Sequence, residues 1–424
     1  METRSNYRDI FVYAQWTGMK EPVYMGRLQA EYVRAKEIFS FSYSDSWLNS
    51  SYSQILDPEL QFFSGSQYAS DEKPNFGIFL DSSPDRWGRL LMKRREAAAA
   101  RSESRSERTL RESDYLLGVF DGHRMGALRF KENPDGPFLN NNEELASPPW
   151  TSIKELEQIS LRLENEEAAD DPDYLKWLSM LINPCSSLGG SRPKASVLDN
   201  KNNLWIAKFP SRNDIKNTGG WEMVTNELAI NAGINVALSM VRKFSSPHYT
   251  FLTKRFDRTS SGERIHYASA MTMLGYDYGT DFHEGVSYLE IVNFLTENGA
   301  DVENDLKELW RRIVYNIFIS NTDDHLRNHG FILTEKGWIL SPAFDINPNE
   351  DGAGLSLNIS LDDNALNLDI PLEIAEYFRL NKESGVKIIE QIKKSVSRWR
   401  TAADKYKLPR SEQEIMAKAF DRFI

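Results

Sequence analysis

The side chains best suited to chemistry lie between residues 321 and 345. Asp323 and Asn328 have the spacing Asp-x-x-x-x-Asn, and Asp345 follows one short segment, 330–340, that is typical of a hairpin. A carboxylate that accepts a proton, followed by an amide and a second carboxylate that bind metal, is the arrangement of a kinase catalytic loop and its metal-binding aspartate. The spacing therefore predicts phosphoryl transfer.

The elements expected around these residues agree with that chemistry. Residues 310–319 form an apolar helix-like run, and residues 330–333 and 338–340 have the pattern of two short strands around Glu335-Lys336-Gly337. Polar residues between such elements are displayed rather than buried. Asp-x-x-x-x-Asn also arises by chance, since Asn and Asp are ordinary turn residues, so the prediction depends on what lies upstream.

A glycine-rich stretch and a strand lysine lie upstream in the order found in kinases. Adjacent glycines with small hydroxyl residues, at 187–191, can bring backbone N–H groups to phosphate oxygens, although Gly-Gly-Ser is also simply a turn. The strand 204–210 carries Lys208 among apolar residues, where a charge needs a partner. Glu227 lies on a helix expected from Trp221 to Asn231, and a strand lysine paired with a helix glutamate is a kinase feature. The alternative for Glu227 is a surface carboxylate.

The remaining patterns predict an α+β, two-lobed, protein-kinase-like fold. Alternating residues at 10–13 and 38–43 and a strand at 125–130 indicate an extra N-terminal α/β subdomain, and Ser83 is the expected N-cap of a following helix, with Pro84 at its first position. Residues 249–258 are expected to leave the small lobe as a hinge. The large lobe should be mostly helical, with helices at 372–380, 382–406 and 411–423. The predicted domains are 1–132, 150–270 and 271–424.

Composition excludes several classes of protein. The 424 residues carry a net charge of −11 and one cysteine, which argues against coating nucleic acid by bulk charge and agrees with a reducing, cytosolic compartment. No apolar run is long enough to span a bilayer. His325 and His329 lack a third clustered metal ligand, which favours structural roles. Residues 86–111 hold nine basic and three acidic side chains, either a solvated helix face or a local contact with nucleic acid or an acidic partner.

Together the motifs resemble those of HipA-type serine/threonine kinases, the toxin half of bacterial HipBA toxin–antitoxin modules. The resemblance covers nearly the whole chain. Its N-terminal motifs are Asp81-Ser82-Ser83-Pro84-Asp85-Arg86-Trp87-Gly88-Arg89 and Met125-Gly126-Ala127-Leu128. Its kinase motifs are Ser187-Leu188-Gly189-Gly190-Ser191-Arg192-Pro193-Lys194, Ala207-Lys208-Phe209-Pro210, Arg255-Phe256-Asp257-Arg258, 321–328 and Ser341-Pro342-Ala343-Phe344-Asp345.

The resemblance assigns a role to each matching residue. It implies that Asp323 is the catalytic base, that Asn328 and Asp345 bind Mg²⁺, and that Lys208 binds phosphate. Ser187 matches the serine that the family autophosphorylates, and Ser191 offers a second hydroxyl, so the modified serine stays open. Arg192 stands where some members have glutamine. The full set expected to bind nucleotide is Ser187, Gly189, Gly190, Ser191, Lys194, Lys208, Glu227, Phe256, Asp257, His325 and Asn328.

The resemblance also implies partners. These are ATP, Mg²⁺, a bacterial protein substrate such as an aminoacyl-tRNA synthetase, and a HipB-like helix-turn-helix antitoxin through which alone the protein would reach DNA. A cytoplasmic protein with no membrane partner and a part in bacterial persistence is expected. Two alternatives remain: a small-molecule kinase, and a catalytically weak kinase fold that acts as a corepressor with a DNA-binding antitoxin.

Overall fold

The structure is a computed structural model that describes residues 7–143, 146–182, 190 and 192–424. The chain forms two compact units. Unit 1 comprises residues 1–211 and 257–268, and unit 2 comprises residues 212–256 and 269–424. The division into 1–132, 150–270 and 271–424 remains a prediction about folding domains, which compactness alone does not test.

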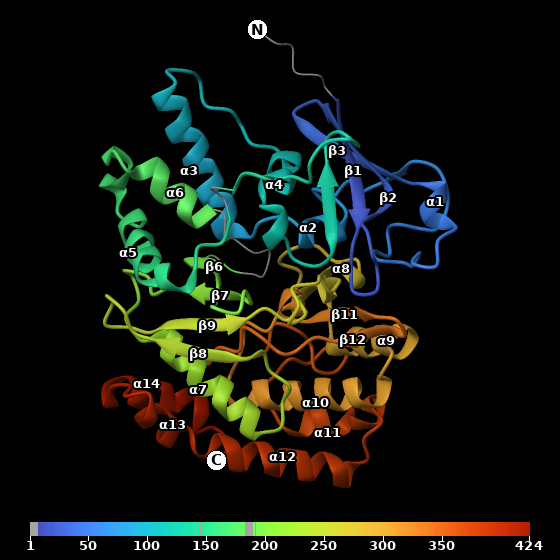
Figure 1. Cartoon of the computed structure of the whole chain (residues 1–424). Coiled ribbons are helices and arrows are strands. Elements are labelled where there is room, and N and C mark those ends of the chain that lie inside the picture. The colour runs from blue at the N-terminus through green and yellow to red at the C-terminus, as the bar shows by residue number, and fades with distance from the viewer. Residues whose placement is uncertain (1–6, 144–145, 183–189, 191) are drawn as a thin grey trace. The chain divides into compact units, whose positions relative to one another are not determined.

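Unit 1 is built around a five-stranded antiparallel sheet with the strand order β4-β3-β2-β1-β5 (Figure 1). In β1, which lies between β2 and β5, Ile10, Val12 and Ala14 are fully buried and alternate with more exposed residues, as expected for a sheet with one face on the core. The strands predicted at 10–13 and 38–43 are confirmed as β1 and β3, and the strand predicted at 125–130 is β5, which begins at Leu128. The strands of the sheet are β1 (Tyr7–Ala14), β2 (Val23–Val33), β3 (Lys36–Tyr43), β4 (Gln67–Tyr68) and β5 (Leu128–Lys131).

Helices and one hairpin complete unit 1. The helix α3 packs against α6, and both carry a buried apolar face. The strands β6 (Lys194–Leu198) and β7 (Leu204–Lys208) pair antiparallel. The helices are α1 (Asp45–Leu48), α2 (Gly77–Asp81), α3 (Arg86–Ser102), α4 (Glu112–Gly118), α5 (Ile153–Leu163) and α6 (Tyr174–Ile182).

The N-terminus of the basic helix α3 differs from the prediction. Ser83 is not its N-cap, because its hydroxyl donates to the carbonyl of Phe79 at 2.8 Å. Asp85 takes that position, and its Oδ1 accepts the N–H of Gly88 at 2.8 Å. A carboxylate satisfies a free N–H group and also interacts favourably with the positive end of the helix dipole, so α3 begins at Arg86.

Helices make up most of the regular secondary structure of unit 2, and a mostly helical lobe was predicted for residues 271–424. Two antiparallel hairpins, β8–β9 and β11–β12, accompany the helices, and β10 (Tyr267–Ser269) spans the last crossing between units. Among the described residues, no helix combines the length and the hydropathy needed to cross a bilayer. The elements are α7 (Thr218–Asn231), β8 (Ser239–Arg242), β9 (Thr250–Lys254), α8 (Ala270–Met273), α9 (Tyr288–Asn298), α10 (Val302–Phe318), β11 (Gly330–Thr334), β12 (Gly337–Leu340), α11 (Asp369–Glu373), α12 (Lys382–Val396), α13 (Trp399–Lys405) and α14 (Arg410–Phe420).

Two predicted helices of unit 2 are interrupted. The helix expected at 382–406 is two helices, α12 and α13, and the turn between them lets Trp399 stack on Phe420 with ring centroids 4.9 Å apart. The helix expected at 372–380 is α11 followed by a 3-10 turn, ending where Arg379 has a φ of +55°. In the first case packing between distant residues outweighs local helical periodicity.

Candidate functional site

The candidate catalytic loop, residues 319–329, connects α10 to β11 in unit 2. The core-facing side of α10 is fully buried, with Trp310 at 0% exposure. The burial of α10 fixes the position at which the loop begins. Ser320 has a left-handed φ of +52°, and the N–H of Asn321 returns to the carbonyl of Asn316 at 2.9 Å. The chain therefore turns sharply at the end of α10 instead of continuing as a helix.

Asp324 anchors this loop from inside the unit. Its Oδ2 accepts hydrogen bonds from the hydroxyl of Tyr288 at 2.6 Å, Nδ2 of Asn316 at 2.8 Å and Nε2 of His329 at 2.8 Å. Burial alone raises the pKa of Asp324, but His329 and the hydroxyl of Tyr288 hold that pKa below its ordinary value. The buried side chain is therefore an ionised acceptor that ties α9, α10 and the start of β11 to the loop.

Asp323, the predicted catalytic base, is exposed on the other side of the same loop. Its backbone carbonyl accepts Nδ2 of Asn328 at 2.9 Å and the N–H of His325 at 3.0 Å. Partial desolvation raises the pKa of the Asp323 carboxyl, His325 lowers it, and the nearby Asp345 and Asp324 raise it further, with a net increase. A carboxylate with an elevated pKa is a stronger base for a hydroxyl proton.

Asn328 is placed as a metal ligand would be. It is 5% exposed, its Nδ2 is used by the carbonyl of Asp323, and its buried Oδ1 has no hydrogen-bond partner among the described residues. A buried amide oxygen without a donor suits a hard cation such as Mg²⁺, which is held by few protein ligands and by substrate phosphates. Within the described part of the chain, no group of three or more His, Cys, Asp or Glu side chains is placed to hold a metal.

Asp345 lies on a strained turn after β12. Its φ is +58°, a region that non-glycine residues occupy at a cost and that is common at functional sites. The turn is held in place because the carbonyl of Ile346 accepts the hydroxyl of Thr225 at 2.6 Å. Oδ1 of Asp345 accepts Nδ2 of Asn347 at 2.8 Å, which fixes the orientation of the carboxylate.

In unit 1, Lys208 stands at the end of β7, directly opposite Lys194 of β6. Side chains of directly opposed residues share a face of the sheet, which would place two like charges together. The charge of Lys194 is neutralised by a buried ion pair, in which Nζ lies 2.7 Å from Oδ2 of Asp85. Nζ of Lys194 also lies 3.3 Å from the carbonyl oxygen of Gly190, whose φ is +88°. Lys194 therefore ties the hairpin to the N-terminus of α3.

Phe256 and Asp257 lie on opposite sides of a unit boundary. In unit 1, Oδ2 of Asp257 is fully buried and accepts the N–H of Gly126 at 2.9 Å and Nη1 of Arg258 at 2.7 Å. In unit 2, the ring of Phe256 lies 5.6 Å from that of Phe344, the residue before Asp345. Both motifs expected to contact nucleotide are therefore ordered by contacts within their own units.

Glu227 has partners that the sequence did not indicate. Its Oε2 accepts the hydroxyl of Tyr406 at 2.5 Å and Nζ of Lys405 at 2.7 Å, all within unit 2. The other carboxylate in the middle of α7, Glu222, is only 4% exposed. The pairing of Lys208 with Glu227 remains a prediction, and the structure offers Glu222 as a more deeply buried carboxylate on the same helix.

The structure thus brings Asp323, His325 and Asn328 together in one loop, close enough to Asp345 for its charge to act on Asp323. Three predicted residues of the glycine-rich stretch lie outside the described residues, namely Ser187, Gly189 and Ser191. Sequence reasoning missed the roles of Asp324, Tyr288 and Asn316. The only sequence signal for them was the second aspartate of the Asp323-Asp324 pair.

Comparison with known proteins decides the family. Residues 186–400, just over half of the 424-residue chain, match the HipA-like C-terminal domain. The chain belongs to the HipA family. The family assignment agrees with the resemblance seen in the motifs.

Two relatives show how far the likeness extends. The solved structure of the Shewanella oneidensis toxin–antitoxin protein HipA, in complex with HipB and operator DNA, has a TM-score of 0.65 and 18% identity, and the match covers 97% of this chain and 95% of that one. It confirms the α+β, two-lobed, kinase-like fold. A putative kinase of Haemophilus influenzae is 27% identical over 128 residues, 29% of this chain and 37% of that protein's own length. The chain thus spans well under half of that curated relative.

Proposed function

We propose that this HipA-family protein is an ATP-dependent kinase that phosphorylates serine or threonine hydroxyls of a protein. One observation carries the proposal: the exposed carboxylate of Asp323 lies on a loop that the buried carboxylate of Asp324 holds in place. In the same loop, the amide oxygen of Asn328 has no hydrogen-bond partner among the described residues. This is the arrangement that phosphoryl transfer needs, a positioned base beside metal ligands.

Each residue has a definite task in this proposal. Asp323 accepts the proton of the attacking hydroxyl, and its raised pKa favours that transfer. Asn328 and Asp345 would hold Mg²⁺, which when bound supplies positive charge to the phosphoryl group being transferred. Lys208 binds the ATP phosphates, and backbone N–H groups of the glycine-rich stretch surround them. Phe256 and Asp257 would flank the adenine side of the site.

We extend the proposal to partners and regulation. The Shewanella HipA was solved with HipB and operator DNA, which supports a helix-turn-helix antitoxin as partner, with DNA bound only through it. Autophosphorylation at Ser187 or Ser191 would add about −1.5 to −2 charges beside the ATP phosphates and so weaken ATP binding. A protein of this kind would act in the cytoplasm.

Labelled ATP, with the protein and a bacterial lysate, tests the kinase activity directly. We expect labelled protein bands with the wild type and none with Asp323→Asn, because general-base catalysis contributes roughly 10²- to 10⁴-fold. Asp362→Asn is the matched control, since Asp362 is an exposed aspartate of unit 2 outside the loop. Activity of Asp323→Asn within a few-fold of the control would rule out the assignment of the base. Turnover with metabolites but not with protein would instead identify a small-molecule kinase.

A further inference from the structure

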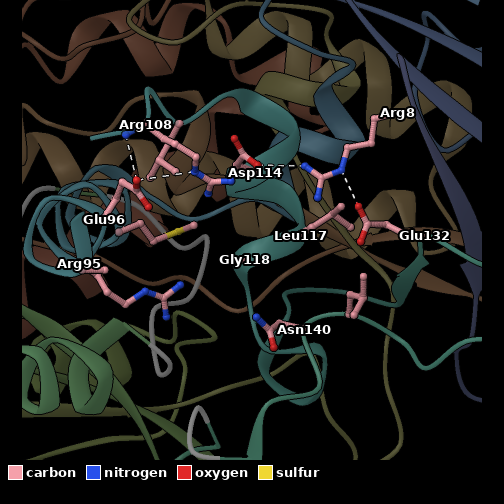
Figure 2. A pocket seen from close by; sticks show the side chains of 13 residues that line it. Arg8, Arg95, Glu96, Arg108, Asp114, Leu117, Gly118, Glu132 and Asn140 are labelled. Atoms are coloured by element: carbon pink, nitrogen blue, oxygen red, sulfur yellow. Dashed lines mark hydrogen bonds and ion pairs between the residues drawn. The ribbon is translucent and has the colours of Figure 1, made fainter. Parts of the chain in front are cut away.

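A cavity of about 300 Å³ lies within unit 1 (Figure 2), and none of the residues that line it is assigned above to catalysis or nucleotide binding. It is lined by the inner sides of α3 and α4 and by residues 139–140 after β5. This volume is at the lower end of the range for small-molecule sites.

The basic run of residues 86–111 supplies positive charge near this cavity. Most of its arginines bind other groups of unit 1. Both terminal nitrogens of Arg89 bind the carboxylate of Glu112, at 2.6 and 2.7 Å. Nη1 of Arg94 donates to the carbonyl of Leu163 at 2.7 Å. These two arginines bind other groups of unit 1, so their guanidinium groups are not available to bind nucleic acid.

Each carboxylate that lines the cavity already has a guanidinium partner. Oε1 of Glu96 accepts Nη1 of Arg105 at 2.6 Å. The other two carboxylates both bind Arg8, with Oδ1 of Asp114 at 3.0 Å from Nη1 and Oε1 of Glu132 at 2.6 Å from Nε. The acidic side chains are therefore neutralised before any ligand enters.

Arg95 is the exception among the lining arginines. Figure 2 shows dashed lines at Arg8 and Arg108 but none at Arg95, and no hydrogen bond or ion pair engages its guanidinium among the residues that the structure describes. Burial lowers the pKa of Arg95, while the neighbouring Glu96 raises it less. A partly buried cation without hydrogen bonds pays a desolvation cost that an anion would offset.

The other walls of the cavity complete a binding site. Oδ1 of Asn140 accepts the N–H of Asn142 at 2.8 Å, and within the described chain its Nδ2 has no acceptor. Apolar side chains, among them Met92, Leu117 and Leu139, also line the cavity. A few polar donors set in an apolar lining are characteristic of sites for small organic ligands.

We propose that this cavity binds a small organic anion. Its oxyanion head, a carboxylate or a phosphate monoester, would be held by the Arg95 guanidinium in a two-pronged contact and by the Asn140 amide, and its apolar body would rest on Met92, Leu117 and Leu139. The planar fork of arginine matches both kinds of oxyanion. The lining shares no residue with the proposed kinase centre, and the proposal does not depend on that centre.

Calorimetric titration of the full chain with phenyl phosphate and with benzoate tests the proposal, because the two probes share an apolar body and differ in the head. We expect at least one probe to bind, and Arg95→Gln to weaken that binding about tenfold or more, as expected for the loss of charge-assisted hydrogen bonds. Arg101→Gln is the matched control, since Arg101 is an exposed arginine on the same helix. It should bind within twofold of the wild type.

Further variants separate the outcomes. Tighter binding of phenyl phosphate identifies a phosphate monoester as the natural head, and tighter binding of benzoate identifies a carboxylate. Lys208→Met should leave the affinity unchanged, which excludes binding at the nucleotide site. Ala99→Leu keeps Arg95 but fills the cavity, so it should abolish binding even if Arg95→Gln folds poorly. Failure of both probes to bind, or equal affinities in wild type, Arg95→Gln and Ala99→Leu, would overturn the proposal.

Discussion

Replacing Asp324 with asparagine should separate the support of the catalytic loop from its chemistry. The substitution keeps the size of the side chain and leaves Asp323 intact. It removes the negative charge that three donors now share, the hydroxyl of Tyr288, Nδ2 of Asn316 and Nε2 of His329. All three donors bind Oδ2, so an asparagine can keep an amide oxygen at that position, but this neutral oxygen is a weaker acceptor than the carboxylate.

The expected magnitude follows from these three contacts. Hydrogen bonds to charged groups contribute about 1.5–3 kcal/mol each and neutral ones about 0.5–1.5 kcal/mol, so each bond weakens by roughly 1 kcal/mol and the set by roughly 3 kcal/mol. Part of this lost stability is offset, because a neutral asparagine costs less to bury than a charged carboxylate. A loop displaced by about 1 Å can cost about 10²-fold in rate, so we expect kcat to fall about a hundredfold with little change in affinity for Mg-ATP.

Thermal denaturation, phosphorylation of a lysate protein and ATP titration should be measured together on Asp324→Asn. Tyr288→Phe removes one donor of the three and should give an intermediate loss of stability, and Asp362→Asn serves as the exposed control. Wild-type melting and wild-type kcat in Asp324→Asn would refute the anchoring role. Loss of ATP affinity with unchanged kcat would assign Asp324 to nucleotide binding instead.

Three further predictions concern the nucleotide and pH. Mg-ATP at about one hundred times its Kd should stabilise the wild type by ~2.7 kcal/mol, and thermal shift assays should show that Lys208→Met and Asp345→Ala lose most of this gain. Glu227→Gln should keep the ATP-induced shift but lower the melting temperature through its lost contacts with unit 2 side chains; loss of the shift would support its pairing with Lys208. Burial raises the pKa of Asp57 to about 6, against two backbone N–H bonds that lower it. Since this pKa is above the unfolded value of about 3.9, its contribution to stability is present below about pH 4 and lost as the pH rises through about 6, roughly 3 kcal/mol in all. Melting curves from pH 4 to 7 should show this decline in the wild type and a flatter profile in Asp57→Asn.

Local patterns predicted the elements of the candidate site well. The strands that flank residues 335–337 and the helix before the loop were expected from periodicity, and the structure has them as β11, β12 and α10. Spacing alone was enough to place Asp323 and Asn328 in one loop, because residues five positions apart in a turn cannot separate far. Alternation likewise predicted β1 and β3, where one face is buried.

Contacts between distant residues escaped prediction. Asp324 is bound by Tyr288, which lies 36 positions earlier in the sequence. No local sequence pattern predicts a contact between residues so far apart. Glu227 meets Lys405 and Tyr406 nearly 180 positions later, at separations of 178 and 179. The N-cap of α3 was misplaced for a more local reason, since Ser83 and Asp85 are both good caps and the hydroxyl of Ser83 found an acceptor in the preceding turn.

The segment 257–268 belongs to unit 1, although it follows residues 212–256 of unit 2 in the sequence. This order affects when unit 1 can fold during synthesis. Arg258 donates to the carbonyls of Gly122 and Arg124 at 3.2 and 2.8 Å, and Arg264 binds Asp121 at 3.2 Å. These acceptors are made early on the ribosome, but their donors emerge only after α7, β8 and β9. Unit 1 therefore cannot finish folding as a nascent N-terminal piece. It must wait, with the carbonyls of residues 122–124 still hydrated, until translation has passed residue 268.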